Sequence, residues 1–188
     1  WFSATDYIGA FSPGSDTENN WASGWTIGVF EAPECPEGTL ESEVMLGKKV
    51  CSLSGAVTSN LTLVAGNYYK LDGKVAVGKD MGADGTASGG VSATLTIAPG
   101  VTVFGESGND YLVVMRGSDI HAVGTSSAPI IMTGRQDILG EADIINTRGL
   151  WGGLVILGQA PINKCSFSTA GSATSAGTRV SPCEKEVE

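Results

Sequence analysis

The sequence predicts an all-β protein, built as a parallel β-helix with an irregular, aromatic-rich cap at its N-terminus. The composition combines 27 glycines in 188 residues with an ordinary apolar fraction of 41%, as expected for many tight turns between buried strands. Apolar and polar residues alternate over runs of four to six residues that glycines punctuate, which is the signal of short strands. No segment carries a persuasive helical stripe.

The segment 1–48 is predicted to be the cap, and residues 49–188 the coils. Three of the four tryptophans lie in this first segment, at Trp1, Trp21 and Trp25, without regular alternation around them. Aromatic side chains in an irregular segment usually cover an apolar surface. We therefore expect these rings to be buried against the first coil, with stacking on sugars as the less favoured alternative.

From about residue 50 onward, short alternating runs follow one another along the chain. Each run places two apolar residues on one face, which we expect to point inward. The segment 135–149 is predicted to be a long loop with one helical turn, because Gly140 interrupts its apolar pattern. The expected inward pairs are Leu61 and Leu63, Val75 and Val77, Leu95 and Ile97, Val101 and Val103, Leu112 and Val114, Ile120 and Ala122, Ile130 and Met132, and Val155 and Leu157.

The strand pattern recurs along the chain. The apolar anchors Ile97, Val114, Ile131 and Val155 lie 17, 17 and 24 residues apart. A spacing near 20, with about three short strands per unit, is typical of β-helix coils, each of which must stack on its neighbours to bury its inward face. An antiparallel sandwich is the alternative. It would favour hairpin turns, and only Asp72-Gly73 directly separates two candidate strands.

Charge and hydropathy exclude several partners. The formal net charge is −9, with 20 acidic against 11 basic residues, which disfavours nucleic acid and anionic lipid and leaves cations as plausible partners. No apolar run approaches the roughly 20 residues of a membrane-spanning helix. We therefore expect no membrane span in this chain.

Four cysteines fall into two pairs, Cys35 with Cys51 and Cys165 with Cys183, which are 16 and 18 residues apart. No pair has the spacing of a zinc site, and the single His121 does not complete one. We therefore predict two local disulfides and an oxidising compartment. Four buried free thiols in a cytosolic protein are the alternative.

Several segments carry a family resemblance. "ATLTIAPGVTVFG" (93–105), "YLVVMRGSDIHAVGTSSAPIIMTG" (111–134) and "GLWGGLVILGQAPIN" (149–163) resemble coils of bacterial secreted or surface-anchored right-handed parallel β-helix proteins of uncharacterised function. "DYIGAF" and "WASGWT" resemble the N-terminal segment of the same group. The resemblance implies export, and it implies that this chain is the N-terminal part of a longer protein. It brings no catalytic residues with it.

We expect a structural or interaction protein of the cell surface or extracellular matrix: a fibre, an adhesin stalk or a scaffold subunit. Its expected partners are further copies of itself, other surface proteins or polysaccharide, and no cofactor is expected apart from possible calcium. The reason for this expectation is that the sequence indicates a regular stack of strands and no group of reactive side chains that would converge on one point. Strand edges at an open coil would also invite pairing with another molecule.

The alternative function is a polysaccharide lyase or hydrolase on the same scaffold. Its candidate catalytic residues are Asp119, His121 and Arg116, because Asp119 and His121 share an outward strand face where an acid and an imidazole could exchange protons. Such a pair is also an ordinary polar surface.

Weak calcium candidates lie in two loops, Asp80 with Asp84 and Asp16 with Glu18, since oxygen ligands in flexible loops suit this ion. Neither loop matches a known calcium motif. Solvated acidic loops are therefore the favoured interpretation.

Overall fold

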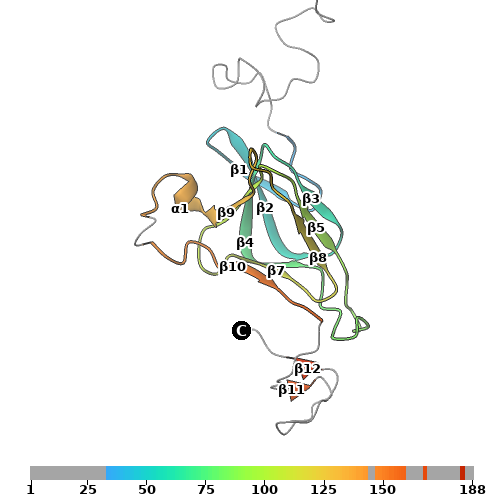
Figure 1. Cartoon of the computed structure of the whole chain (residues 1–188). Coiled ribbons are helices and arrows are strands. Elements are labelled where there is room, and N and C mark those ends of the chain that lie inside the picture. The colour runs from blue at the N-terminus through green and yellow to red at the C-terminus, as the bar shows by residue number, and fades with distance from the viewer. Residues whose placement is uncertain (1–32, 144–146, 160–166, 169–182, 185–188) are drawn as a thin grey trace, which may run out of the picture.

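Short strands dominate the protein, and the computed structural model describes them over residues 33–143 and 147–159 and in two short strands at 167–168 and 183–184 (Figure 1). The prediction of an all-β protein is confirmed, because the one helix of the described residues is a single turn. In chain order the elements are β1 (Leu40–Met45), β2 (Lys48–Val57), β3 (Leu61–Leu63), β4 (Tyr68–Val77), β5 (Thr94–Ile97), β6 (Thr102–Gly105), β7 (Tyr111–Val114), β8 (Asp119–Ala122), β9 (Ile131–Gly134), α1 (Arg135–Ile138), β10 (Gly153–Ile156), β11 (Phe167–Ser168) and β12 (Cys183–Glu184).

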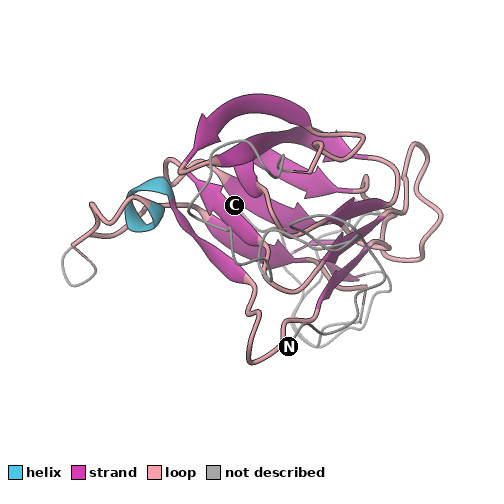
Figure 2. Ribbon diagram, turned by 90° about the horizontal axis from the view of Figure 1, so that it is seen from above, coloured by secondary structure: helices cyan, strands magenta, loops and turns pink. Residues whose placement is uncertain are grey.

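Strands β2 to β10 stack in three ladders of parallel strands. The first ladder is β3-β5-β8. The second runs from the N-terminal halves of β2 and β4 to β6 and β9, and the third from their C-terminal halves to β7 and β10. Figure 2 shows these strands around a common centre, with α1 projecting to one side. All pairings among these strands are parallel, so the alternative of an antiparallel sandwich is wrong.

The coils contain about three strands each, as predicted, but their spacing is not the predicted one. Paired residues are 18 positions apart from Val50 to Tyr68 and 34 apart from Leu61 to Leu95. Three of the predicted anchors, Ile97, Val114 and Ile131, lie in three different ladders instead of stacking on one another. The coil length varies because loops of different length, such as residues 78–93, are inserted at the corners.

One strand departs from the parallel stack. β1 pairs antiparallel with β2, and its register shifts between Glu41 and Glu43, so the larger sheet is mixed. β1 lies inside the segment 1–48, so residues 40–45 of the predicted irregular cap form a regular strand. Trp1, Trp21 and Trp25 lie outside the described residues.

The inward pairs predicted from Leu61 to Val114 are all buried and belong to one core cluster. In β10 the prediction is wrong by one residue: Leu154 and Ile156, not Val155 and Leu157, align with the inward Leu112 and Val114 of β7. The cause is the continuous apolar run "LVIL", which has no alternation to identify its inner face.

A second, smaller apolar cluster covers the outer face of the second ladder. Met45 of β1 packs there with Val50 and Phe104, and Ile138 and Leu139 reach the same cluster from α1 and its end. The predicted helical turn within residues 135–149 is thus confirmed as α1, and it serves as part of this outer cover.

The disulfide Cys35–Cys51 is present, with a Cα–Cα distance of 5.6 Å. It ties the chain ahead of β1 to β2. The predicted disulfide between Cys165 and Cys183 is untested, since Cys165 and the side chain of Cys183 lie outside the described residues. Within the described parts of the chain, no helix is long and apolar enough to cross a membrane.

Candidate functional site

The sequence-derived candidates lie near one corner of the stack, where the loop 78–93 meets the turn between β7 and β8. Two backbone hydrogen bonds between Lys79 and Val91 close the base of this loop. The Met81 N–H donates to the Arg116 carbonyl at 3.1 Å, and the Ser92 hydroxyl donates to the Gly117 carbonyl at 2.6 Å. The loop is therefore fastened to the turn at positions 116 and 117. We call this region the Arg116 corner.

Arg116 and Asp80 form a bidentate ion pair at this corner. Nε of Arg116 donates to Oδ1 of Asp80 at 2.7 Å, and Nη2 donates to Oδ2 at 2.5 Å. The pair lowers the pKa of Asp80, and the Gly82 N–H contributes to the same effect against the opposing influence of burial. Bidentate geometry fixes both partners more firmly than a single contact would. The arginine therefore acts here as a tie between the loop and the turn.

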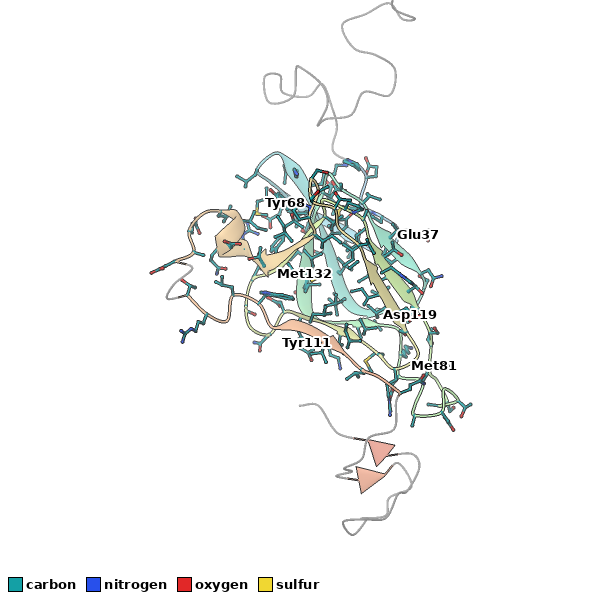
Figure 3. All side chains as sticks on the ribbon, viewed as in Figure 1. Glu37, Tyr68, Met81, Tyr111, Asp119 and Met132 are labelled. Atoms are coloured by element: carbon teal, nitrogen blue, oxygen red, sulfur yellow. A yellow bond between two sulfur atoms is a disulfide. The ribbon has the colours of Figure 1, made fainter. Side chains whose placement is uncertain are left out.

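Gly117 allows the loop to approach this closely. Its φ of +80° lies in the left-handed region, and a Cβ atom at this position would lie 2.6 Å from Cγ of Met81. Any larger residue would strain the backbone and push Met81 outward. Figure 3 shows Met81 and Asp119 along the same edge of the molecule.

Asp119 and His121 lie on the exposed outer face of β8, as predicted. In the first ladder Asp119 is the neighbour of Thr94 and His121 is the neighbour of Thr96. The structure thus brings the acid and the imidazole onto one polar strip with threonines. Arg116, the third candidate, is held in a bidentate pair by a different acid, Asp80.

The calcium candidates Asp80 and Asp84 do not fit a metal site together. Both oxygens of Asp80 accept hydrogen bonds from Arg116, and Oδ1 of Asp84 accepts one from the Thr86 N–H at 3.0 Å. The hydrogen bonds from Thr86 lower the pKa of Asp84. Over the described part of the chain, no three His, Cys, Asp or Glu side chains converge as a metal cluster would require. Asp16 and Glu18 lie outside the described residues.

Sequence reasoning missed Asp110, the most heavily bonded carboxylate of the described residues. It accepts the N–H groups of Gly73, Glu106 and Ser107 at 2.8, 2.9 and 2.8 Å, and the Ser107 hydroxyl at 3.1 Å. Burial raises the pKa of Asp110, but these donors outweigh it and leave the pKa below its ordinary value.

The donors to Asp110 come from two successive coils. Gly73 marks the bend where β4 passes from the second ladder to the third, and the other donors belong to the β6–β7 turn of the next coil. Asp110 therefore joins the bend of β4 to the β6–β7 turn of the next coil. The Ser-x-x-Asp spacing in "SGND" could have signalled such a turn.

Arg135 is the second group that the sequence did not reveal. Its guanidinium binds Glu43 of β1, with Nη2 to Oε2 at 3.0 Å, and also Glu106, with Nη1 to Oε1 at 3.0 Å. The hydrogen bond from Arg135 lowers the pKa of Glu43 despite some burial, and the pairing raises the pKa of Arg135. This cluster holds β1 and α1 over the outer face of the second ladder.

One comparison with known proteins gave a match. The family model described as "Pectate-lyase like beta helix domain" matches residues 55–181, which is more than half of the chain. The match covers β3 to β10 and so includes all three ladders. No curated protein and no solved structure matches the chain.

Proposed function

Because the chain belongs to the pectate-lyase-like β-helix family, we propose that it forms right-handed parallel β-helix coils and serves as an exported structural or interaction module. Its place is the cell surface or the extracellular matrix, as a fibre, an adhesin stalk or a scaffold subunit. Three ladders of parallel strands around one core support the fold part of this proposal.

The functional part of this proposal rests on the contacts that the charged side chains of the described residues make. Arg116 and Asp80 tie a loop to a turn, Asp110 stacks two corners, and Arg135 fastens β1 to the end of β9. These strongly bonded charges join one segment of the chain to another. A catalytic site needs charged groups directed at a common point where substrate can bind.

Export is supported by the disulfide Cys35–Cys51. Disulfides persist in oxidising compartments and are rare in the cytosol. The acidic composition, with a net charge of −9, favours solubility in a saline exterior.

The proposal is tested in the native host and with purified protein. Labelling intact cells with a membrane-impermeant amine reagent should modify the protein, and a panel of acidic polysaccharides should show no release of reducing or unsaturated ends. Protein that is labelled only after lysis would contradict export, and steady release of sugar ends would contradict a purely structural role.

A polysaccharide lyase or hydrolase is the second candidate, favoured by the description of the family and by the exposed Asp119 and His121. If turnover is found, Asp119→Asn and His121→Gln should each abolish it, since each removes one proton-transferring group. Thr62→Ser, on the same outer face of the first ladder, is the control and should leave turnover unchanged. Full activity in both variants would remove this site from consideration.

A further inference from the structure

The chain contains two Asp-Gly dipeptides, Asp72-Gly73 and Asp84-Gly85. In such a dipeptide the glycine nitrogen can attack the aspartate side chain, because glycine has no Cβ atom to obstruct the approach. The nitrogen bonds to Cγ, the Cγ–OH bond breaks, and the amide proton leaves with the hydroxyl as water. Water then opens the resulting cyclic imide, and opening at the main-chain carbonyl leaves an isoaspartate. The conversion needs no oxidant or reductant.

The first dipeptide is held inside β4 in a way that blocks this reaction. The Gly73 N–H donates to Oδ1 of Asp110 at 2.8 Å, so its nitrogen is fixed against a different carboxylate. Asp72 itself is paired with Ser54 of β2 in the parallel ladder. Turning the chain so that the Gly73 nitrogen could reach the side chain of Asp72 would break these contacts.

The second dipeptide lies near the tip of the loop 78–93, outside the strands. The side chain of Asp84 is exposed there, and none of the described residues accepts a hydrogen bond from the Gly85 N–H. Figure 3 shows this loop projecting from the stack beside the labelled Met81. The chain at Asp84 and Gly85 can therefore turn without breaking a strand ladder.

The carboxyl of Asp84 is already folded toward its own main chain. Its Oδ1 accepts the Thr86 N–H at 3.0 Å, which is the contact of an Asx turn. This contact holds the carboxyl over the peptide group that contains the attacking Gly85 nitrogen, so little ordering remains before ring closure. The Thr86 N–H also stabilises the charge that develops on this oxygen as the nitrogen adds.

The hydrogen bonds from Thr86 oppose the reaction in one respect. They lower the pKa of Asp84, so the protonated carboxyl, from which water can leave, is a minor form at neutral pH. The conversion is therefore slow, and its product accumulates with the age of the protein.

We propose that Asp84 is a site of spontaneous isoaspartate formation in the folded protein, and that Asp110 protects Asp72 from the same modification. Isoaspartate carries the main chain through Cβ and Cγ and so lengthens the backbone at the loop tip. Hydrogen bonds between Lys79 and Val91 close the base of the loop, which keeps the change local. This inference goes beyond the proposed function and does not depend on it.

Storage of the full chain at body temperature and neutral pH tests the proposal. The modified positions are identified by mass spectrometry and with an endoprotease that cleaves before aspartate but not before isoaspartate. In the folded protein, isoaspartate should form at position 84 on the order of tenfold faster than at position 72. In concentrated urea, where neither dipeptide is held, the two rates should be similar.

Two variants test the protection of Asp72. Asp110→Ala releases the Gly73 N–H, so isoaspartate should now appear at position 72. Ser107→Ala is the matched control, because it removes one donor to Asp110 and keeps the contact with Gly73, so position 72 should stay unmodified. Circular dichroism verifies the folding of both variants. If Asp110→Ala does not fold, the comparison of the two positions in the wild type decides.

Three outcomes would overturn the proposal. The first is equal rates at the two positions in the folded protein. The second is an unmodified Asp84 in folded protein under conditions in which the urea-unfolded chain is converted. The third, a position 72 that stays unmodified in folded Asp110→Ala, would remove the protective role of Asp110. Surface labelling and polysaccharide turnover are unaffected by any of them, so the proposed function stands or fails separately.

Discussion

The guanidinium of Arg135, directly after β9, binds the carboxylate of Glu43 in β1 across 92 positions of the sequence. The contact closes the outer apolar cluster, in which Met45 and Phe104 are buried. β1 is the edge strand next to β2, and Arg135 directly follows β9, so this ion pair joins the two ends of the strand order β1-β2-β4-β6-β9. The pair ties the first residue of α1 to β1.

Arg135→Gln should lower the free energy of unfolding by about 1 kcal/mol, since the pair is partly exposed and solvent screens it. Arg148→Gln, which changes an exposed arginine of the same long loop, should have no measurable effect. Urea denaturation followed by circular dichroism gives both values. Equal losses in the two variants would show that the contact with Glu43 contributes nothing specific.

Asp110→Asn should destabilise the protein by about 2 kcal/mol, because the amide places its own N–H groups against donors that the carboxylate accepted. The folded-state pKa of Asp110 lies below its ordinary value. The stabilisation is therefore present above the ordinary value near 4 and is lost as the pH falls through the lower, folded-state pKa. Unfolding midpoints measured from neutral to acidic pH should converge for wild type and variant.

Asp72→Asn provides the control for the variant at position 110. Asp72 is an exposed acid beside Gly73, in the same bend of β4. Its replacement should change the midpoint little at any pH. A constant difference between wild type and Asp110→Asn across the pH range would contradict the assigned role of the carboxylate.

Reduction of the disulfide Cys35–Cys51, or Cys35→Ser with Cys51→Ser, should cost about 3 kcal/mol, because it releases a loop of 16 residues in the unfolded chain. Thermal unfolding with and without a reductant measures the loss. Peptide mapping under non-reducing conditions identifies the linked residues. The same map tests the predicted pair Cys165–Cys183, and a linkage between Cys35 and any other cysteine would contradict the structure.

Tyr69→Phe should destabilise the protein by about 2 kcal/mol. The Tyr69 hydroxyl donates to the Val64 carbonyl at 3.0 Å and accepts the Val64 N–H at 2.9 Å, and the residue has no exposed surface. The variant removes the hydrogen-bond partner of both backbone groups of Val64, beside the buried ring. Tyr111→Phe, which alters a half-buried tyrosine of β7, is the control and should cost less than half as much.

Tyr69 should also limit stability at alkaline pH. Burial raises the pKa of its hydroxyl, although the hydrogen bonds with Val64 and Asn67 partly oppose this. The unfolded chain therefore loses this proton first, so stability should fall as the pH rises above about 10. The fall should be smaller in Tyr69→Phe, and an identical alkaline profile would contradict the assignment.

The alternation of apolar and polar residues predicted the strands well wherever one face of the strand is buried and the other face is exposed. The runs that contain Leu95 and Ile97, or Leu112 and Val114, are strands of the structure with those residues inward. In β10 every residue of the run is apolar, so period two could not identify the inner face. The predicted spacing of the coils was wrong because the corner loops differ in length. The strands still pair in parallel from one coil to the next, so the number of residues between paired positions changes.

The strongly bonded charges were hard to predict for a different reason. Glu43 and Arg135 are neighbours only because β1 turns back along β2, and no local pattern encodes that contact. Asp119 and His121 were predictable as a pair because two alternating positions of one strand share a face. The pairing of Arg116 with Asp80 could not be predicted, because Asp80 lies 36 positions away in an inserted loop.

The corner loops have a practical consequence. Hydrogen bonds between Lys79 and Val91 close the base of the loop 78–93, and the ion pair of Asp80 with Arg116 holds its first residues in place. We therefore expect that changes at the tip, around Thr86, leave the core unchanged. A foreign peptide spliced into that tip should be displayed on the outside of the scaffold without altering strand register. The molecule thus offers a ready attachment point for an epitope or an affinity tag.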